Sequence, residues 1–230
     1  MNSISGEFET GTIVPLLTKP VSRTMVLLGK LFAAFLLLLT AYTLLFIYQV
    51  IGGTIVYGPQ NNLHLVPLLL LGNILSTFVW MAIVLALGAL TKNSLITALV
   101  AFGVFAALLI TAPTVSVFTG QAGALSYVPG SGATGYLVPA GNQIAINASS
   151  ISTGTDAIAS NFVNYVLNPS ANVTFAKISS LTAGQTPSLV PVYTEALSLV
   201  LLRSVLVALA YAIVFLLVAW IAFKRAQILD

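Results

Sequence analysis

Four long runs of apolar residues dominate the chain and predict four membrane-spanning helices. A helix needs roughly 20 apolar residues to cross a bilayer core about 30 Å thick. The runs are continuously apolar rather than alternating, which favours helices over the strands of a membrane barrel. They occupy residues 31–51, 66–90, 95–118 and 198–223.

The composition supports lipid as the solvent for most of the chain. Only 6% of the residues are charged and 58% are hydrophobic, whereas a soluble domain has about a quarter charged residues. The sequence therefore predicts an all-α polytopic membrane protein. With no cysteine, one histidine and five acidic residues, we expect no metal site, no catalytic residue and no enzymatic activity. The eight basic residues form no clustered patch, so nucleic acid is not an expected partner.

The distribution of basic residues predicts which ends of the spans face the cytoplasm. Loops on the cytoplasmic side carry an excess of Lys and Arg. Alternating the spans puts six basic residues on one side and only Lys177 on the other. Both termini are therefore predicted to be cytoplasmic, in a multi-pass protein of the plasma membrane. The six are Lys19, Arg23, Lys30, Lys92, Lys224 and Arg225.

The long link before the last span is predicted to be an ordered extracytoplasmic cap, because Ile, Val, Phe and Tyr recur through it. Within it, residues 156–167 predict a short amphipathic helix capped by Asp156. The Gly-rich residues 130–135 read as a flexible loop, since no Gly-Lys-Ser/Thr follows them. The resulting domains are a cytoplasmic segment (1–24), a three-helix membrane region (25–118), the cap (119–195) and the last helix with its tail (196–230).

Several single residues outside the opening segment are candidate sites. Asn147 and Asn172 each begin a glycosylation sequon in the predicted cap.

Arg203 lies just inside the last apolar run, either as an interface anchor or in a transport-pathway or partner role, with Glu195 as a potential ion-pair partner. Lys30, Lys224 and Arg225 are further predicted anchors at the membrane interface. Asn73, Ser76, Thr77 and Thr97 are predicted to bridge helices, with substrate contact as the alternative.

The residues before the first span combine charge with a short apolar helix. Thr12 or Gly11 can cap a helix over residues 12–18, and Pro20 ends it. Ser22 can then cap the helix that enters the membrane. One interpretation is an ordinary membrane-entry segment with snorkelling basic side chains. The other is a docking surface for a second protein, because acidic residues and apolar side chains lie together outside the bilayer.

This segment resembles the cytoplasmic segment of ABC-2 type transporter permeases. The family pattern is E-x-E-x-G-T-[LI]-x-x-L-L-[ST]-x-P-[VI]-S-R, followed by a Gly-Lys pair. The resemblance covers about a tenth of the chain. The matching residues are Glu7, Glu9, Gly11, Thr12, Ile13, Leu16, Leu17, Pro20, Val21, Ser22, Arg23, Gly29 and Lys30.

The resemblance implies a coupling helix that sits in a cleft of a separate ATP-hydrolysing subunit. Glu7 and Glu9 would face that subunit, the helix from Thr12 to Leu17 would be docked in it, and Pro20 to Arg23 would pass its movement to the first span. ATP and Mg would be bound by the partner, with no cofactor in this chain. A second permease copy or a paralogue would complete the transporter. Family permeases usually have two spans before this segment, so two further N-terminal helices are expected either upstream or from a partner.

Two alternatives to a transport permease follow from the sequence. One is a non-transporting membrane anchor or assembly factor that acts through its extracytoplasmic cap. The other is a passive channel, which is disfavoured because no charged or carbonyl-rich filter sequence is evident. The apolar spans lean towards a lipid-like or amphiphilic cargo, with ion, metal-cofactor and peptide cargoes as alternatives.

Overall fold

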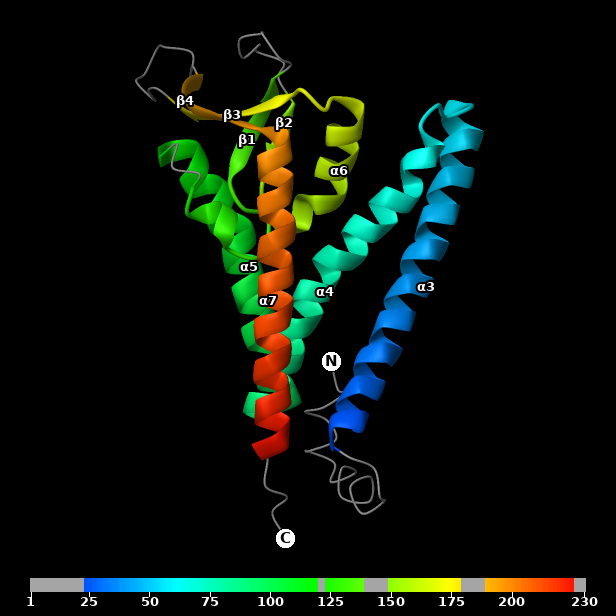
Figure 1. Ribbon diagram of the computed structural model, residues 1–230, viewed down its shortest axis with the longest axis vertical. Helices are drawn as coiled ribbons and strands as arrows, with labels where there is room; N and C mark the ends of the chain where they lie inside the picture. The colour runs from blue at the N-terminus through cyan, green and yellow to red at the C-terminus, as the bar shows by residue number, and fades with distance from the viewer. Residues whose placement is uncertain (1–22, 120–122, 139–148, 179–188, 226–230) are drawn as a thin grey trace. The chain divides into compact units, whose positions relative to one another are not determined.

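A computed structural model describes residues 23–119, 123–138, 149–178 and 189–225, and in it the predicted spans are four long helices (Figure 1). Each is long and apolar enough to cross a membrane, so the prediction of four membrane-spanning helices is confirmed. The four helices are α3 (Arg23–Tyr57), α4 (Val66–Thr91), α5 (Ser94–Thr119) and α7 (Leu197–Arg225).

The first helix is longer than its apolar run predicts. α3 starts at Arg23, as expected for a helix that follows a cap at Ser22, and it continues beyond the apolar run to Tyr57. It stops at Gly58, whose φ of 81° is the left-handed conformation that ends many helices. The amide of Gly58 donates to the carbonyl of Thr54 at 3.1 Å. The helix therefore ends at a local backbone signal rather than where the apolar run stops.

The tight turn between α4 and α5 is held by its own polar side chains. Lys92 adopts a φ of 53°, and Asn93 Oδ1 accepts a hydrogen bond from the Ile96 amide at 2.9 Å. Asn93 thereby caps the N-terminus of α5. Thr91 and Thr97 hydroxyls lie 2.7 Å apart across the turn, so Thr97 stabilises the turn between two successive helices.

The described part of the segment between α5 and α7 is ordered, as predicted, but it contains a β-sheet that the sequence did not predict. Four antiparallel strands lie in the order β2-β1-β3-β4. Figure 1 shows α6 beside this sheet and β4 running directly into α7. The elements are η2 (Leu125–Tyr127), β1 (Thr134–Val138), β2 (Ser150–Ser152), η3 (Thr155–Ala157), α6 (Ile158–Leu167), β3 (Asn172–Ile178) and β4 (Leu189–Ala196).

The core of the cap joins the sheet to the first turns of α7. Phe175 of β3 is 1% exposed and stacks on Tyr193 of β4, with ring centroids 4.6 Å apart. The same buried cluster includes Leu197 and Val200 of α7. The predicted domain boundary at residues 195/196 thus falls at the junction of β4 and α7, and the first turns of the last helix belong to the cap's core.

Two local predictions within the cap are wrong. Asp156 does not cap the helix: it lies in η3, and the N-cap residue of α6 is Ala157, which makes no side-chain capping bond. The Gly-rich stretch is not a flexible loop. Gly130 and Gly132 have positive φ angles of 117° and 66°, and a Cβ on Gly154 would collide with the carbonyl oxygen of Gly130. The glycines permit a tight turn in which two backbone segments touch.

The described residues form two compact units. One comprises residues up to 60, 77–104 and 209 onwards, and the other comprises 61–76 and 105–208. The second unit contains the whole cap with the adjoining ends of α4, α5 and α7.

Candidate functional site

The predicted coupling residues from Glu7 to Ser22 lie outside the described residues, and Arg23 is the first residue of α3. The structure therefore describes the helix that follows the predicted coupling segment, α3. Immediately after Arg23, the first turns of α3 pack on the last turns of α4 and α7. Their shared buried cluster consists of Leu27, Leu85, Ala86, Ala219 and Phe223.

Polar contacts accompany this packing at the ends of α3 and α7. Trp220 Nε1 donates to Thr24 Oγ1 at 3.3 Å, and Lys224 Nζ lies 5.2 Å from the centroid of the Trp220 ring. Lys224 and Arg225 are exposed in the last turn of α7, and Lys30 is half-buried on α3. An exposed cation beside a tryptophan suits the predicted role as a membrane-interface anchor.

One predicted helix bridge is present between α3 and α4. The hydroxyls of Tyr42 and Thr77 lie 2.5 Å apart, so Thr77 joins two membrane helices. Asn73 instead donates to the Leu69 carbonyl of its own helix at 2.9 Å. Such bonds satisfy polar groups that lipid cannot satisfy.

Arg203 forms the ion pair that the sequence suggested. Its NH2 nitrogen lies 2.9 Å from Glu195 Oε2 and its NH1 nitrogen donates to Oε1 at 3.1 Å. Their side chains are only 14% and 23% exposed. Glu195 lies at the end of β4 rather than on a helix turn, and the pair forms because β4 continues directly into α7.

Two tyrosines complete the surroundings of this pair. The guanidinium of Arg203 lies 5.8 Å from the centroid of the Tyr127 ring, a cation–π distance. Burial raises the pKa of Tyr193, and the Glu195 carboxylate raises it further, while Arg203 acts in the opposite direction. The neutral phenol of Tyr193 therefore lies beside the Arg203–Glu195 ion pair. This arrangement suits a structural link between β4 and α7.

Three buried serines connect membrane helices to the cap. Ser204 of α7 donates to the Thr153 carbonyl at 2.7 Å. Ser116 of α5 accepts from the Thr134 amide at 3.0 Å. Ser76 of α4 contacts Asp156 Oδ1 at 3.5 Å. The sequence pointed to Ser76 as a helix-bridging residue, whereas Ser116 and Ser204 were missed, and their only signal was a small hydroxyl in an apolar run.

The two predicted glycosylation sequons differ in what the structure describes of them. Asn147 lies outside the described residues. Asn172 is half-buried at the start of β3, a strand paired on both sides. Among the described residues, no three His, Cys, Asp or Glu side chains gather in a way that could hold a metal ion.

Comparison with protein families finds a match over almost the whole length of the chain. The family model described as "ABC-2 family transporter protein" matches residues 1–228. The chain therefore belongs to the ABC-2 transporter family and is a membrane-embedded transport permease. No curated protein and no solved structure matches the chain significantly.

Proposed function

We propose that this permease is driven by ATP hydrolysis in a separate ATP-binding subunit that docks on residues 1–24 at the cytoplasmic face. Both termini would lie in the cytoplasm, and a second copy or a paralogue would complete the transporter in the plasma membrane. ATP and Mg would be bound by the partner, since the sequence has no Gly-Lys-Ser/Thr phosphate loop. The permease itself would carry no catalytic residue.

The observation that carries this proposal is the packing at the start of α3. The coupling motif ends at Arg23, and only four residues later Leu27 is 4% exposed in contact with the cluster from α4 and α7. Close-packed side chains shift together rather than deform individually. A displacement of the docked segment would therefore reach three membrane helices at once.

The neighbouring small residues make this junction sensitive to movement. Ala86 and Ala219 are 1% and 0% exposed within the cluster. Small side chains let helix backbones approach closely in a membrane. The three helices are therefore packed so closely at this junction that a tilt of α3 would move α4 and α7 with it.

The proposal is tested by co-purifying the chain with its ATP-binding subunit. The double variant Glu9→Lys plus Leu16→Asp reverses a charge and removes an apolar contact in the docking segment, and it should abolish co-purification. Lys177→Glu is the matched control, because it reverses an exposed charge on β3 in the cap and should leave co-purification unchanged. Undiminished binding of the double variant would remove the docking role from this segment.

The complex with the ATP-binding subunit also distinguishes a transport permease from a membrane anchor or assembly factor. ATP hydrolysis that depends on residues 1–24 supports the permease proposal. Function that survives their deletion but is lost when the cap is removed would support an anchor or assembly factor instead.

A further inference from the structure

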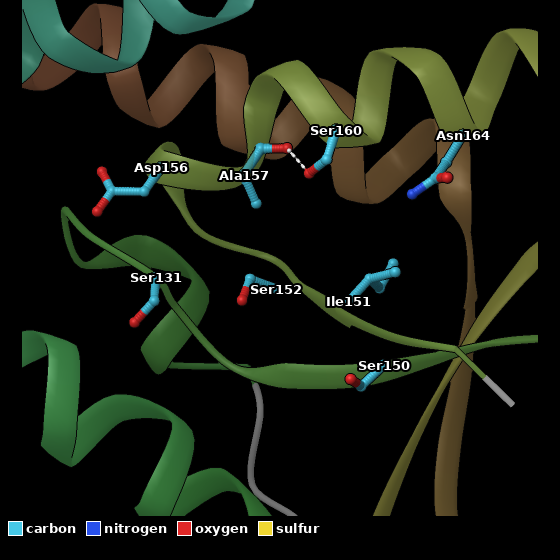
Figure 2. A pocket seen from close by; sticks show the side chains of 8 residues that line it. All are labelled: Ser131, Ser150, Ile151, Ser152, Asp156, Ala157, Ser160 and Asn164. Carbon is cyan, nitrogen blue, oxygen red and sulfur yellow. Dashed lines mark hydrogen bonds between the residues drawn. The ribbon is translucent and has the colours of Figure 1, made fainter. Parts of the chain in front are cut away.

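The cap contains a pocket of about 380 Å³ that opens between α6 and β2. Figure 2 shows Ser160 and Asn164 reaching into it from α6, with Ser150 and Ser152 on the facing strand. This volume lies within the usual range of small-molecule sites, roughly 300–1,000 Å³. The whole pocket is built from one compact unit of the chain.

Hydroxyl groups dominate the lining. Besides the three serines on β2 and α6, Ser131 projects from the turn before β1, and its Oγ is buried without a hydrogen-bond partner among the described residues. Ser160 donates to the Ala157 carbonyl at 3.0 Å, which leaves its oxygen free to accept. A serine hydroxyl offers one donor and two acceptor positions. The lining can therefore match a ligand that presents several hydroxyl groups.

Asp156 is the charged residue in this lining, and it stands at one end of the pocket in Figure 2. Its Oδ1 accepts hydrogen bonds from the hydroxyls of Ser76 and Thr155 at 3.5 Å each. Among the described residues that line the pocket, none has a basic side chain. A carboxylate in this position favours a cationic ligand and disfavours an anionic one.

The apolar part of the lining is too small to hold an acyl chain or an aromatic ring. Of the described lining residues, only Ile151 and Ala157 contribute purely aliphatic side chains, and none is aromatic. Most small-molecule sites are predominantly apolar. This pocket instead matches a ligand that is hydrophilic throughout.

The pocket walls are fixed by hydrogen bonds that do not involve a ligand. The Gly130 amide donates to Thr155 Oγ1 at 2.9 Å, and the Asp156 amide donates to the Gly130 carbonyl at 3.1 Å. On the other side, fully buried Asn161 donates to the Ser152 carbonyl at 2.9 Å. A preformed site loses less entropy on binding.

We propose that this pocket binds a small hydroxyl-bearing cation of the amino-sugar class. Asp156 would pair with the ammonium group, while the serine hydroxyls and the Asn164 amide would bind the ring hydroxyls. Because Asp156 also contacts Ser76 of α4, the bound ligand lies one hydrogen bond from a membrane helix.

The first test compares three probes of similar size that differ in charge. The purified full chain in nanodiscs is titrated by calorimetry with glucosamine, glucose and glucuronate at pH 6.5, where the amine of glucosamine is protonated. Binding should be tightest for glucosamine, weaker for glucose and weakest for glucuronate. Equal affinities, a reversed order or no binding of glucosamine would each overturn the proposal. The ATP-binding subunit is absent, so failure here is distinct from failure of the proposed coupling.

The second test assigns the charge preference to Asp156. Asp156→Asn keeps an acceptor for Ser76 and should weaken glucosamine binding about tenfold or more, with glucose affinity changed less than about twofold. Ser160→Leu should block both sugars by filling the pocket. Ser170→Leu, at an exposed position in the same cap, is the matched control and should bind both as the wild type does. An unchanged preference for glucosamine in Asp156→Asn would contradict the assignment.

Discussion

The hydroxyl of Ser204 on α7 donates a hydrogen bond to the carbonyl oxygen of Thr153 in the cap at 2.7 Å, across 51 positions of sequence. Ser204 is fully buried, and the Val200 carbonyl of its own helix, at 2.9 Å, is a second acceptor for the same hydroxyl proton. Thr153 follows β2, so this bond connects the last membrane helix to an edge strand of the sheet. The cap and the first turns of α7 thus form one hydrogen-bonded structure.

Ser204→Ala should destabilise the protein, because the buried Thr153 carbonyl loses the Ser204 hydroxyl as a donor. An unsatisfied buried polar group costs about 1–3 kcal/mol. The expected result is a lower midpoint of thermal unfolding in detergent, followed by tryptophan fluorescence. Thr40→Ala is the control, since among the described residues the exposed Thr40 bonds only to the Leu36 carbonyl one turn back, at 2.8 Å. Equal shifts in the two variants would show that the bond to the cap contributes nothing.

Gly72→Ala should also destabilise the cap. A Cβ at Gly72 of α4 would lie 2.5 Å from the Ala159 Cα of α6, so one of two backbones must move. Gly103→Ala is the control, because a Cβ there meets nothing within 4 Å. Alanine within a helix is favoured over glycine by roughly 0.5–1 kcal/mol. We expect the unfolding midpoint to fall for Gly72→Ala and to stay or rise for Gly103→Ala; a fall in both would contradict the close contact.

The membrane helices could be predicted because lipid offers the backbone no hydrogen-bond partners. An apolar run of that length must satisfy its own amides, so the run itself predicts the helix. The ends were less predictable: α3 extends to Tyr57 because nothing stops it before Gly58. The Arg203–Glu195 pair was foreseen from proximity along the chain, although Glu195 proved to lie on a strand.

The sheet and its contacts to the helices could not be predicted, because they depend on pairing between distant segments. β2 has only three residues, and β1 shows no strict alternation of buried and exposed positions. Its pairing with Val173 and Thr174 of β3 spans more than thirty positions. A serine in an apolar helix such as Ser116 or Ser204 carries no signal of its partner. The pocket arises from the same long-range pairing, so its lining was not visible in the sequence.

Removing one partner of the Arg203–Glu195 pair should cost more than removing both. Arg203→Met leaves a largely buried carboxylate without its counter-charge, which costs about 3–5 kcal/mol when burial is complete. The side chains here are 14% and 23% exposed, so the loss should be smaller. The double variant Arg203→Met plus Glu195→Met should recover much of the unfolding midpoint. Lys177→Met, an exposed charge on β3, is the control, and a double variant worse than the single would contradict the pairing.

Tyr193 should make the protein less stable at alkaline pH. Its pKa in the folded state is raised above the ordinary value of 10.0 by burial and by Glu195. The folded state therefore keeps its proton when the unfolded state has lost it, and stability falls as the pH rises through 10 towards the folded-state pKa. Tyr193→Phe should flatten this fall, and it should cost little at pH 8, because the buried hydroxyl has no hydrogen-bond partner among the described residues.

The check is the unfolding midpoint of each variant between pH 8 and 10.5. Tyr57→Phe, at a position 83% exposed, should retain the wild-type decline. If the decline persists unchanged in Tyr193→Phe, another group causes it.

Ala219→Leu should separate docking from coupling in the complex with the ATP-binding subunit. Ala219 is fully buried with Leu27 and Phe223, and replacing its methyl by an isobutyl group costs about 1–3 kcal/mol by forcing the helices apart. The docking segment at residues 1–24 is untouched, so co-purification should persist, while ATP hydrolysis stimulated by the permease should fall severalfold. Ala33→Leu, at an exposed position on α3, should keep wild-type hydrolysis. Unchanged hydrolysis in Ala219→Leu would mean that movement does not pass through this cluster; lost co-purification would mean that the cluster positions the docking segment itself.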